Sequence, residues 1–168
     1  MKKAILLTAL MVSLMNVAQA QVGSSLFGFE GRVYLDGDKG KNVSITLYDN
    51  NKKVSSYETN RSGKFFLDIE RNKHYTVVFK KEGFLAKRVI IKTHAKPNEV
   101  ADVEAFKFDM NLEKKEFGVN YAQLDFPVTM IEFERLKGEF DYNKEYTENM
   151  IKIQEKYLEK QTNLAATQ

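Results

Sequence analysis

The residues best suited to metal chemistry in this chain are two histidines, His74 and His94. A zinc peptidase needs three protein ligands and a carboxylate base, commonly with two of the ligands on one short motif. The two histidines stand twenty residues apart, and no His-Glu-x-x-His motif surrounds either of them. We therefore expect two histidines at the surface or at a strand edge, and neither a metal centre nor a bound cofactor.

Two further patterns look chemical, but turns explain both. Asp36 and Asp38 stand two positions apart in Asp-Gly-Asp-Lys-Gly, and paired carboxylates can bind a hard cation such as Ca²⁺. A helix-loop-helix calcium site also needs an acid at its twelfth position, where this chain has Leu47. Ser62 lies in Arg-Ser-Gly rather than in the Gly-x-Ser-x-Gly motif of hydrolases. We interpret both segments as turns and expect no enzymatic activity.

Three tyrosines form one candidate binding surface. The chain contains 12 Phe and 8 Tyr but no Trp, so any aromatic platform for a sugar ring would be built from tyrosine. Tyr34, Tyr48 and Tyr57 would face outward if their apolar neighbours face inward. They are candidates for stacking on a glycan. The alternative is that they reflect only the preference of tyrosine for β-strands.

A second candidate surface lies in a predicted amphipathic helix over about residues 141–161. Asp141 can serve as its N-cap. Its apolar residues step by 4, 4, 3 and 4 positions and so form one stripe: Tyr142, Tyr146, Met150, Ile153 and Tyr157. The stripe either folds back onto the rest of the chain or binds a partner, and the sequence leaves both interpretations open.

The elements that must carry these residues are short strands separated by turn residues. Apolar and polar positions alternate along them, which is typical of half-buried strands. Because no helical pattern interrupts them, they predict an all-β, antiparallel sandwich. Seven strands are expected: 31–35, 43–48, 52–59, 65–69, 75–79, 84–93 and 106–112.

The pattern changes after the last of these strands. Residues 113–116 form a charged connector, and 128–133 are one more possible strand. Pro127 fits this assignment because proline is tolerated at the first position of a strand. We therefore expect a sandwich over 25–113 and an extension over 114–168 that contains the possible strand and the helix.

The N-terminus has the pattern of an export signal. Two lysines precede an apolar run over residues 4–15, and Ala18-Gln-Ala20 matches a small-x-small cleavage pattern. The apolar run is too short to span a bilayer as a stable helix. We expect residues 1–20 to be removed and the mature chain to begin at Gln21. The periplasm is the expected location, with the cell surface or the medium as alternatives.

Composition narrows the classes of partner. Without its first 20 residues the chain has 24 basic and 23 acidic residues, so it lacks the uncompensated charge that nucleic acids attract. It contains no cysteine, which excludes disulfides, thiolate zinc sites and the cysteine of a lipid anchor. No second apolar run approaches 18 residues, so no transmembrane segment is expected in the mature chain.

Four motifs in register resemble the carboxypeptidase regulatory-like domain. The resemblance implies a transthyretin-like, seven-stranded sandwich that serves as an accessory module and contributes no catalytic residues. Such domains occur beside zinc carboxypeptidases, at the front of outer-membrane nutrient transporters, and in secretion or gliding components. The motifs are Gly31-x-Val33, Val43-x-Ile45-x-Leu47-Tyr48-Asp49, Thr59-x-x-x-Gly63-x-Phe65-x-Leu67 and Tyr75-x-Val77-x-Phe79-Lys80-x-x-Gly83-Phe84.

The extension is also similar to the tails of exported proteins of Gram-negative bacteria, through Gly118-Val-Asn-Tyr121, Pro127 and the segment 140–146. We therefore expect a non-catalytic envelope protein that binds another envelope protein through residues 113–140 and the helix. The alternative is a module that binds a carbohydrate or peptidoglycan through the three tyrosines. The sequence leaves the oligomeric state open.

Overall fold

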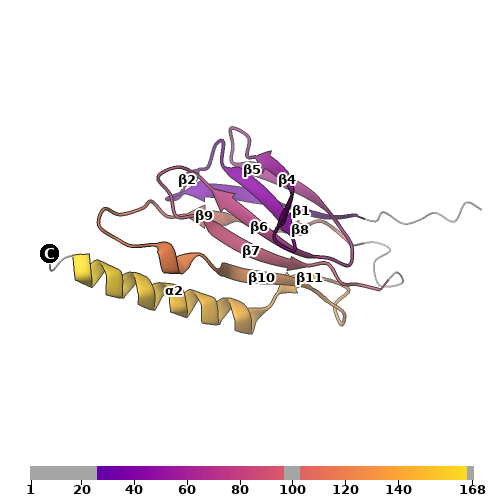
Figure 1. Ribbon diagram of the computed structural model, residues 1–168. Helices are drawn as coiled ribbons and strands as arrows, with labels where there is room; N and C mark the ends of the chain where they lie inside the picture. Colours follow the sequence, from indigo (N-terminus) through magenta and orange to yellow (C-terminus); the bar gives the residue numbers. More distant parts are fainter. Residues whose placement is uncertain (1–25, 97–102, 166–168) are drawn as a thin grey trace, which may run out of the picture.

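The computed structural model describes residues 26–96 and 103–165, so the predicted signal over 1–20 lies outside the described residues. Two mixed β-sheets, of five and six strands, pack face to face, and a C-terminal helix runs along one side of the sandwich (Figure 1). The prediction of an all-β sandwich with a C-terminal helix is confirmed.

The five-stranded sheet is built around the longest strand, β1. Strands β5 and β2 pair with β1 in antiparallel orientation, and β8 and β9 pair with it in parallel orientation. The bounds are β1 Leu26–Leu35, β2 Asp38–Lys39, β5 Lys64–Glu70, β8 Phe106–Lys107 and β9 Met110–Leu112.

The six-stranded sheet has the order β11-β10-β7-β6-β3-β4, so the extension contributes its first two strands. All its neighbours are antiparallel except β10 and β7. The bounds are β3 Ser44–Asp49, β4 Lys52–Glu58, β6 His74–Lys80, β7 Lys87–Lys92, β10 Pro127–Glu134 and β11 Glu139–Tyr142.

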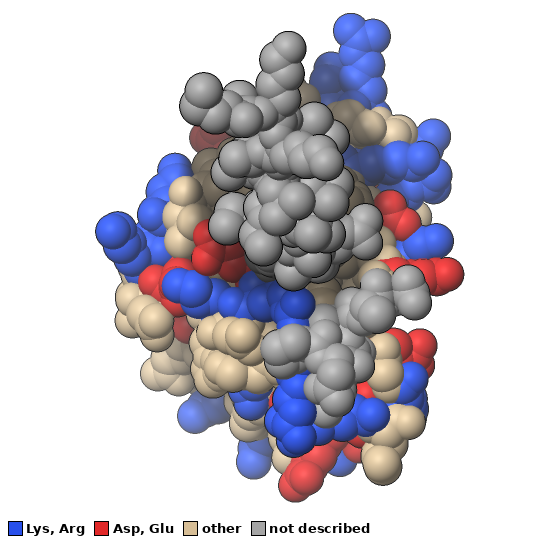
Figure 2. Space-filling model, turned by 90° about the vertical axis from the view of Figure 1, so that its right-hand side faces the viewer, with Lys and Arg blue, Asp and Glu red and all other residues tan. Residues whose placement is uncertain are grey.

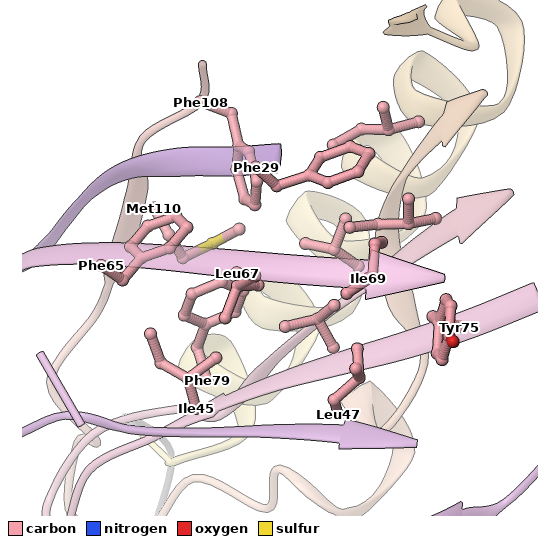
Figure 3. Packing of buried hydrophobic residues seen from close by; sticks show 14 of the residues in the cluster. Phe29, Ile45, Leu47, Phe65, Leu67, Ile69, Tyr75, Phe79, Phe108 and Met110 are labelled. Carbon is pink, nitrogen blue, oxygen red and sulfur yellow. The ribbon is translucent and has the colours of Figure 1, made fainter. Parts of the chain in front are cut away.

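The core lies between the sheets, where the buried residues of most strands meet (Figure 3). In β5 the buried residues are Phe65, Leu67 and Ile69, and every residue between them is exposed. Strand β6 buries its alternate residues in the same way. This is the period-2 pattern that the sequence shows, because successive side chains of a strand point to opposite faces.

The expectation of a wholly antiparallel sandwich is corrected at three strand pairs. Strand β10 runs parallel to β7, and β8 and β9 run parallel to β1. Parallel neighbours need a long connection. Strand β7 is connected to β10 through β8 and β9 of the other sheet, and β1 is connected to β8 through the strands from β2 to β7. The chain leaves the second sheet after β7 and enters the first at β8. It then leaves the first sheet after β9 and enters the second at β10.

One predicted strand, 106–112, is divided into β8 and β9 by the residues between them. The backbone N–H of Phe108 still bonds to the carbonyl of Glu30 at 3.0 Å. At the next position a side chain takes the place of a backbone acceptor: the carboxylate of Asp109 accepts a hydrogen bond from the N–H of Arg32 at 2.8 Å. The possible strand at 128–133 is present as β10.

The helix α2 covers Lys144–Ala165 and begins later than the sequence predicts. Asp141 is not its N-cap, because β11 continues through Tyr142 and keeps Asp141 in a strand, ion-paired with Lys137. The cap is Asn143, whose side-chain oxygen accepts the N–H of Tyr146 at 2.9 Å.

Gly31 is where β1 passes closest to the chain beside it. A Cβ atom at this position would lie 1.6 Å from the carbonyl oxygen of Phe108. At Gly28, in the same strand, the nearest atom is the Cβ of Ala105 at 3.1 Å. The absence of a side chain at Gly31 therefore lets the segment between β8 and β9 lie against β1.

We expect Gly31→Ala to lower the free energy of unfolding by more than about 2 kcal/mol, because backbone atoms must move to admit the methyl group. Urea denaturation of the full-length chain measures the loss. Gly28→Ala is the matched variant and should cost less than about 1 kcal/mol, since shifts of a few tenths of an ångström at Ala105 and Phe66 relieve the contact. Equal losses in the two variants would show that the close approach at Gly31 is unimportant.

Candidate interaction surface

The predicted apolar stripe is divided between two elements. Tyr142 belongs to β11, and its ring centroid lies 5.4 Å from the ring centroid of Phe106. On α2, Tyr146, Met150 and Tyr157 are half-buried, whereas Ile153 keeps 50% of its surface exposed. The structure therefore brings three of the five residues onto the inner face of the helix.

The first turn of α2 covers the part of β10 that β11 leaves unpaired. The N–H of Asn143 bonds to the carbonyl of Met130 at 2.9 Å, which continues the ladder by one residue. The hydroxyl of Tyr146 then donates to the carbonyl of Pro127 at 3.1 Å. Burial raises the pKa of Tyr146, so this hydroxyl keeps its proton. The helix thus protects a sheet edge, and the fold-back interpretation describes its N-terminal half.

Further along, α2 is tied to the connection between β9 and β10. The hydroxyl of Tyr157 donates to the carbonyl of Asn120 at 3.0 Å. Within this connection, the N–H of Glu116 bonds to the hydroxyl of Tyr121 at 2.8 Å. A short 3-10 helix, Ala122–Leu124, follows and buries Leu124. The connection is therefore held from the helix side.

The same connection is also held from the side of the sandwich, at the turn that precedes β7. The N–H of Lys115 bonds to the carbonyl of Gly83 at 2.9 Å, and that of Leu85 bonds to the carbonyl of Glu113 at 2.8 Å. The ammonium of Lys87 lies 2.7 Å from the carboxylate of Glu113. Between the two segments is an open hollow lined by Leu85, Ala86, Lys115, Glu116, Val119, Asn120, Tyr121, Ala122, Leu124 and Asp125.

Phe117, beside this hollow in sequence, has the most exposed apolar side chain of the described residues, at 103% of its reference surface. It stands between Glu116 and Gly118, and the glycine has a positive φ of 80°. Sequence reasoning missed it because a single phenylalanine in a charged connector shows no periodicity. The available signal was the placement of an aromatic residue among polar ones, just before a glycine.

The three tyrosines proposed for glycan stacking do not share one face. Tyr57 pairs with Ile45 and packs against the core, so its predicted outward orientation is wrong. Tyr34 lies next to buried Val33 and faces outward from the five-stranded sheet, whereas Tyr48 lies next to buried Leu47 and faces outward from the other sheet. The glycan role of these residues stays a prediction.

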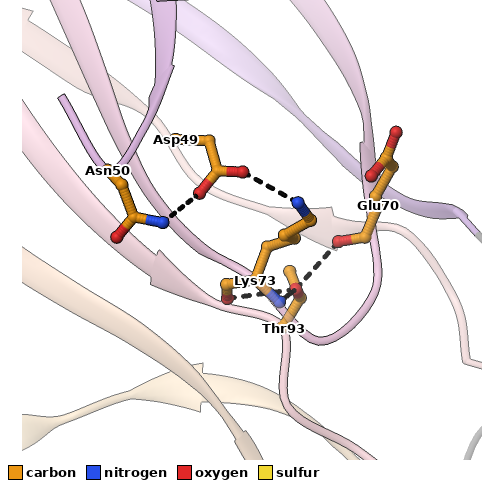
Figure 4. A network of polar contacts seen from close by, with 5 residues as sticks. All are labelled: Asp49, Asn50, Glu70, Lys73 and Thr93. Atoms are coloured by element: carbon orange, nitrogen blue, oxygen red, sulfur yellow. Dashed lines mark hydrogen bonds and ion pairs between the residues drawn. The ribbon is translucent and has the colours of Figure 1, made fainter. Parts of the chain in front are cut away.

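A polar network joins both sheets at the end where β5, β6 and β7 meet (Figure 4). The ammonium of Lys73 lies 2.9 Å from the carboxylate of Asp49, and this hydrogen bond raises the pKa of Lys73. Buried Thr93 donates its hydroxyl proton to the carbonyl of Glu70 at 2.8 Å and accepts the N–H of Lys73 at 2.9 Å. The residues just before the two histidines are thereby fixed.

The structure also brings together His74 and His94, which are distant in the sequence. Both side chains are exposed, and their ring centroids lie 4.7 Å apart with an interplanar angle of 84°. Across residues 26–96 and 103–165, no group of three or more His, Cys, Asp and Glu side chains is placed to hold a metal ion. The histidines form a pair.

The end of the molecule seen in Figure 2 carries both signs of charge. Lys and Arg side chains are interspersed with Asp and Glu over its visible part. In the described part of the chain, no helix has both the length and the apolar character needed to cross a membrane.

Fold and surface together define an all-β sandwich with an edge-covering helix and an exposed connecting loop. No family model matches the chain, and no curated protein matches it. The resemblance to the carboxypeptidase regulatory-like domain therefore stays a prediction.

Solved structures of sheet-rich domains resemble the chain weakly, and it spans less than two thirds of each. They include a 3-chlorocatechol 1,2-dioxygenase from Rhodococcus opacus 1CP (TM-score 0.40, 12% identity, 58% of this chain and 62% of that one). S.CueP has a TM-score of 0.37 and 12% identity over 54% of this chain and 64% of its own. The Bacillus anthracis TIE protein has a TM-score of 0.39 and 17% identity over 52% and 18%.

We expect Tyr146→Phe to lower the free energy of unfolding by about 1 kcal/mol at neutral pH, because the carbonyl of Pro127 loses its hydrogen bond. The raised pKa of Tyr146 means that the folded state holds the phenolic proton more tightly than the unfolded state. Its stabilisation is therefore present below about pH 10 and is lost as pH rises further. The variant should flatten that alkaline loss in denaturant titrations between neutral and alkaline pH.

The matched control for this experiment is Tyr34→Phe, on the outer face of the other sheet. It should change stability by less than about 0.5 kcal/mol, as surface substitutions usually do. If Tyr146→Phe is as neutral as the control, and its alkaline loss is unchanged, the hydroxyl does not hold the helix to β10.

Proposed function

We propose that this chain is a non-catalytic exported envelope protein that acts as a protein-interaction or scaffolding module, and that its extension binds another envelope protein. The observation that carries the proposal is the full exposure of Phe117 on a connection that is tied at both ends. The export signal read from the sequence supports the location, and the resemblance to accessory domains supports a role beside a transport, secretion or gliding complex.

Burial of the Phe117 side chain against a partner would be favourable. Moving one phenylalanine side chain from water into a protein contact is worth about 1.5–3 kcal/mol. Aromatic anchors of this kind contribute a large share of the affinity of many interfaces. Phe117 contributes nothing of this sort to the folded monomer, because its side chain is entirely in solvent. A complex in which a partner's apolar pocket buries this side chain would therefore gain the whole of this burial free energy.

The backbone that carries Phe117 is held by hydrogen bonds. The adjacent N–H groups of Lys115 and Glu116 are bonded to the carbonyl of Gly83 and the hydroxyl of Tyr121, respectively. Much of the ordering of this loop has therefore been completed before a partner binds. Association consequently loses less free energy to loop ordering than it would with a flexible loop.

The helix provides a second apolar contribution. Ile151 and Ile153 keep 44% and 50% of their surface exposed, on the two flanks of the face that packs against β10. Charged residues surround them on α2, including Lys152 and Glu155. A few apolar contacts within a charged surround are typical of interfaces between proteins that also exist separately.

Phe117→Ala tests the proposal. The full-length chain is expressed with an affinity tag in its native host, crosslinked in the envelope and purified, and co-purifying proteins are quantified by mass spectrometry. A specific envelope protein should be recovered with the wild type and at least about tenfold less with the variant, since truncating an aromatic anchor at the centre of an interface typically costs about 2 kcal/mol or more. The stability of the variant should be unchanged.

Phe66→Ala is the matched control, because Phe66 is 50% exposed but lies in β5, outside the extension. It should leave recovery unchanged. Equal recovery with the Phe117 and Phe66 variants would contradict the assignment of Phe117. A preparation that contains no specific protein, but retains polysaccharide or peptidoglycan, would favour the glycan alternative instead.

A further inference from the structure

The pair formed by His74 and His94 is independent of the interaction surface and carries a different chemistry. His74 is the first residue of β6, and His94 lies two residues beyond the end of β7, the neighbouring strand. Because His74 pairs with Lys92, His94 is its diagonal neighbour on the same face. Two imidazoles that are adjacent and exposed offer two nitrogen ligands to an ion arriving from solvent.

The spacing of the rings suits a shared ion. With metal–nitrogen bonds of about 2.0 Å, two imidazoles in tetrahedral positions have ring centroids about 5 Å apart. Two cis imidazoles in a square-planar arrangement have centroids about 4.5 Å apart. The observed separation of 4.7 Å lies between these values, so the two rings are at the right distance to share one ion. In the structure they meet edge to face, and the exposed side chains must rotate to turn a nitrogen of each ring toward the ion.

The backbone that carries the rings is fixed before any ion binds. The N–H groups of Asn72 and Thr93 bond to the carbonyls of Thr93 and Lys73, each at 3.0 Å. The hydroxyl of Thr93, which is completely buried, joins Lys73 to Glu70. A rigid support of this kind reduces the entropy lost when two side chains bind the same ion.

Nearby positive charges would oppose a cation, and two of them are compensated. The ammonium of Lys73 is paired with Asp49 at 2.9 Å, and that of Lys92 with Glu132 at 3.5 Å. Both lysines are immediate neighbours of the pair, one in sequence and one across the strands. Their ion pairs lower the positive potential that an arriving divalent cation meets.

We propose that His74 and His94 form a two-imidazole binding site for a divalent transition-metal ion, with water molecules in the remaining coordination positions. Imidazole nitrogen suits Cu²⁺, Ni²⁺ and Zn²⁺, and a nitrogen site binds Cu²⁺ most tightly of these three. Hard cations such as Mg²⁺ and Ca²⁺ prefer oxygen ligands and should not bind here.

Titration of the purified full-length chain with Cu²⁺ tests the site, followed by calorimetry and electron paramagnetic resonance. The wild type should bind one ion per chain and show two equatorial nitrogen ligands. His74→Gln and His94→Gln should each weaken binding at least about tenfold, because each loses the advantage of a second ligand already in place. The double variant contains no histidine, and its affinity for Cu²⁺ should be close to that of each single variant.

Lys92→Gln is the matched surface control and should not weaken Cu²⁺ binding, and Mg²⁺ should give no heat in any variant. Both histidines are exposed, so circular dichroism should show that all variants fold. The site is overturned if either single variant binds Cu²⁺ as tightly as the wild type. Tight binding in the double variant, or one ion bridging two chains in sedimentation experiments, would overturn it as well.

Discussion

The contact on which the sandwich depends most is made by Phe140. This residue of β11 inserts its ring between the two sheets. Its ring centroid lies 4.9 Å from those of Phe27 and Phe29 in β1 and 5.5 Å from that of Phe133 in β10, all at steep interplanar angles. Edge-to-face pairs of this kind are worth about 0.5–1.5 kcal/mol each beyond the area that they bury. Because β1 belongs to one sheet and β10 to the other, Phe140 joins them. The extension therefore completes the core.

The position of the candidate interaction surface follows from this contact. With Phe140 buried, β11 runs beside β10 and ends at Tyr142, and Asn143 then caps a helix whose first turn lies along the unpaired part of β10. The helix consequently reaches the connection between β9 and β10 near its C-terminal half, where Tyr157 contacts Asn120. That connection carries Phe117 outward. The core contact thus sets the path of the helix that holds one side of this connection, and the turn before β7 holds the other side.

Local patterns in the sequence predict much of this fold, and the contacts that they miss are non-local. The alternation in β3, β5 and β6 is visible because each strand buries one face, and the turn glycines separate them. The orientation of Tyr57 is not visible, because an extra residue at Val54 shifts the alternation of β4 against β3. Asp141 looks like a helix cap until its pairing with Glu132 in the sheet is known. The approach of His74 to His94 depends on the register of β6 and β7, which no periodicity in either strand specifies.

Native-state hydrogen exchange on the full-length chain tests most directly whether the extension is part of one cooperative core. If Phe140 joins the sheets as described, the amides of β10 and β11 that are bonded in the sheet should exchange only through global unfolding. Their opening free energies should then match those of β6. Opening of residues 127–142 at a free energy several kcal/mol lower, with β6 and β7 still protected, would contradict the account. The extension would then be a separately folding attachment to a sandwich that is stable without it.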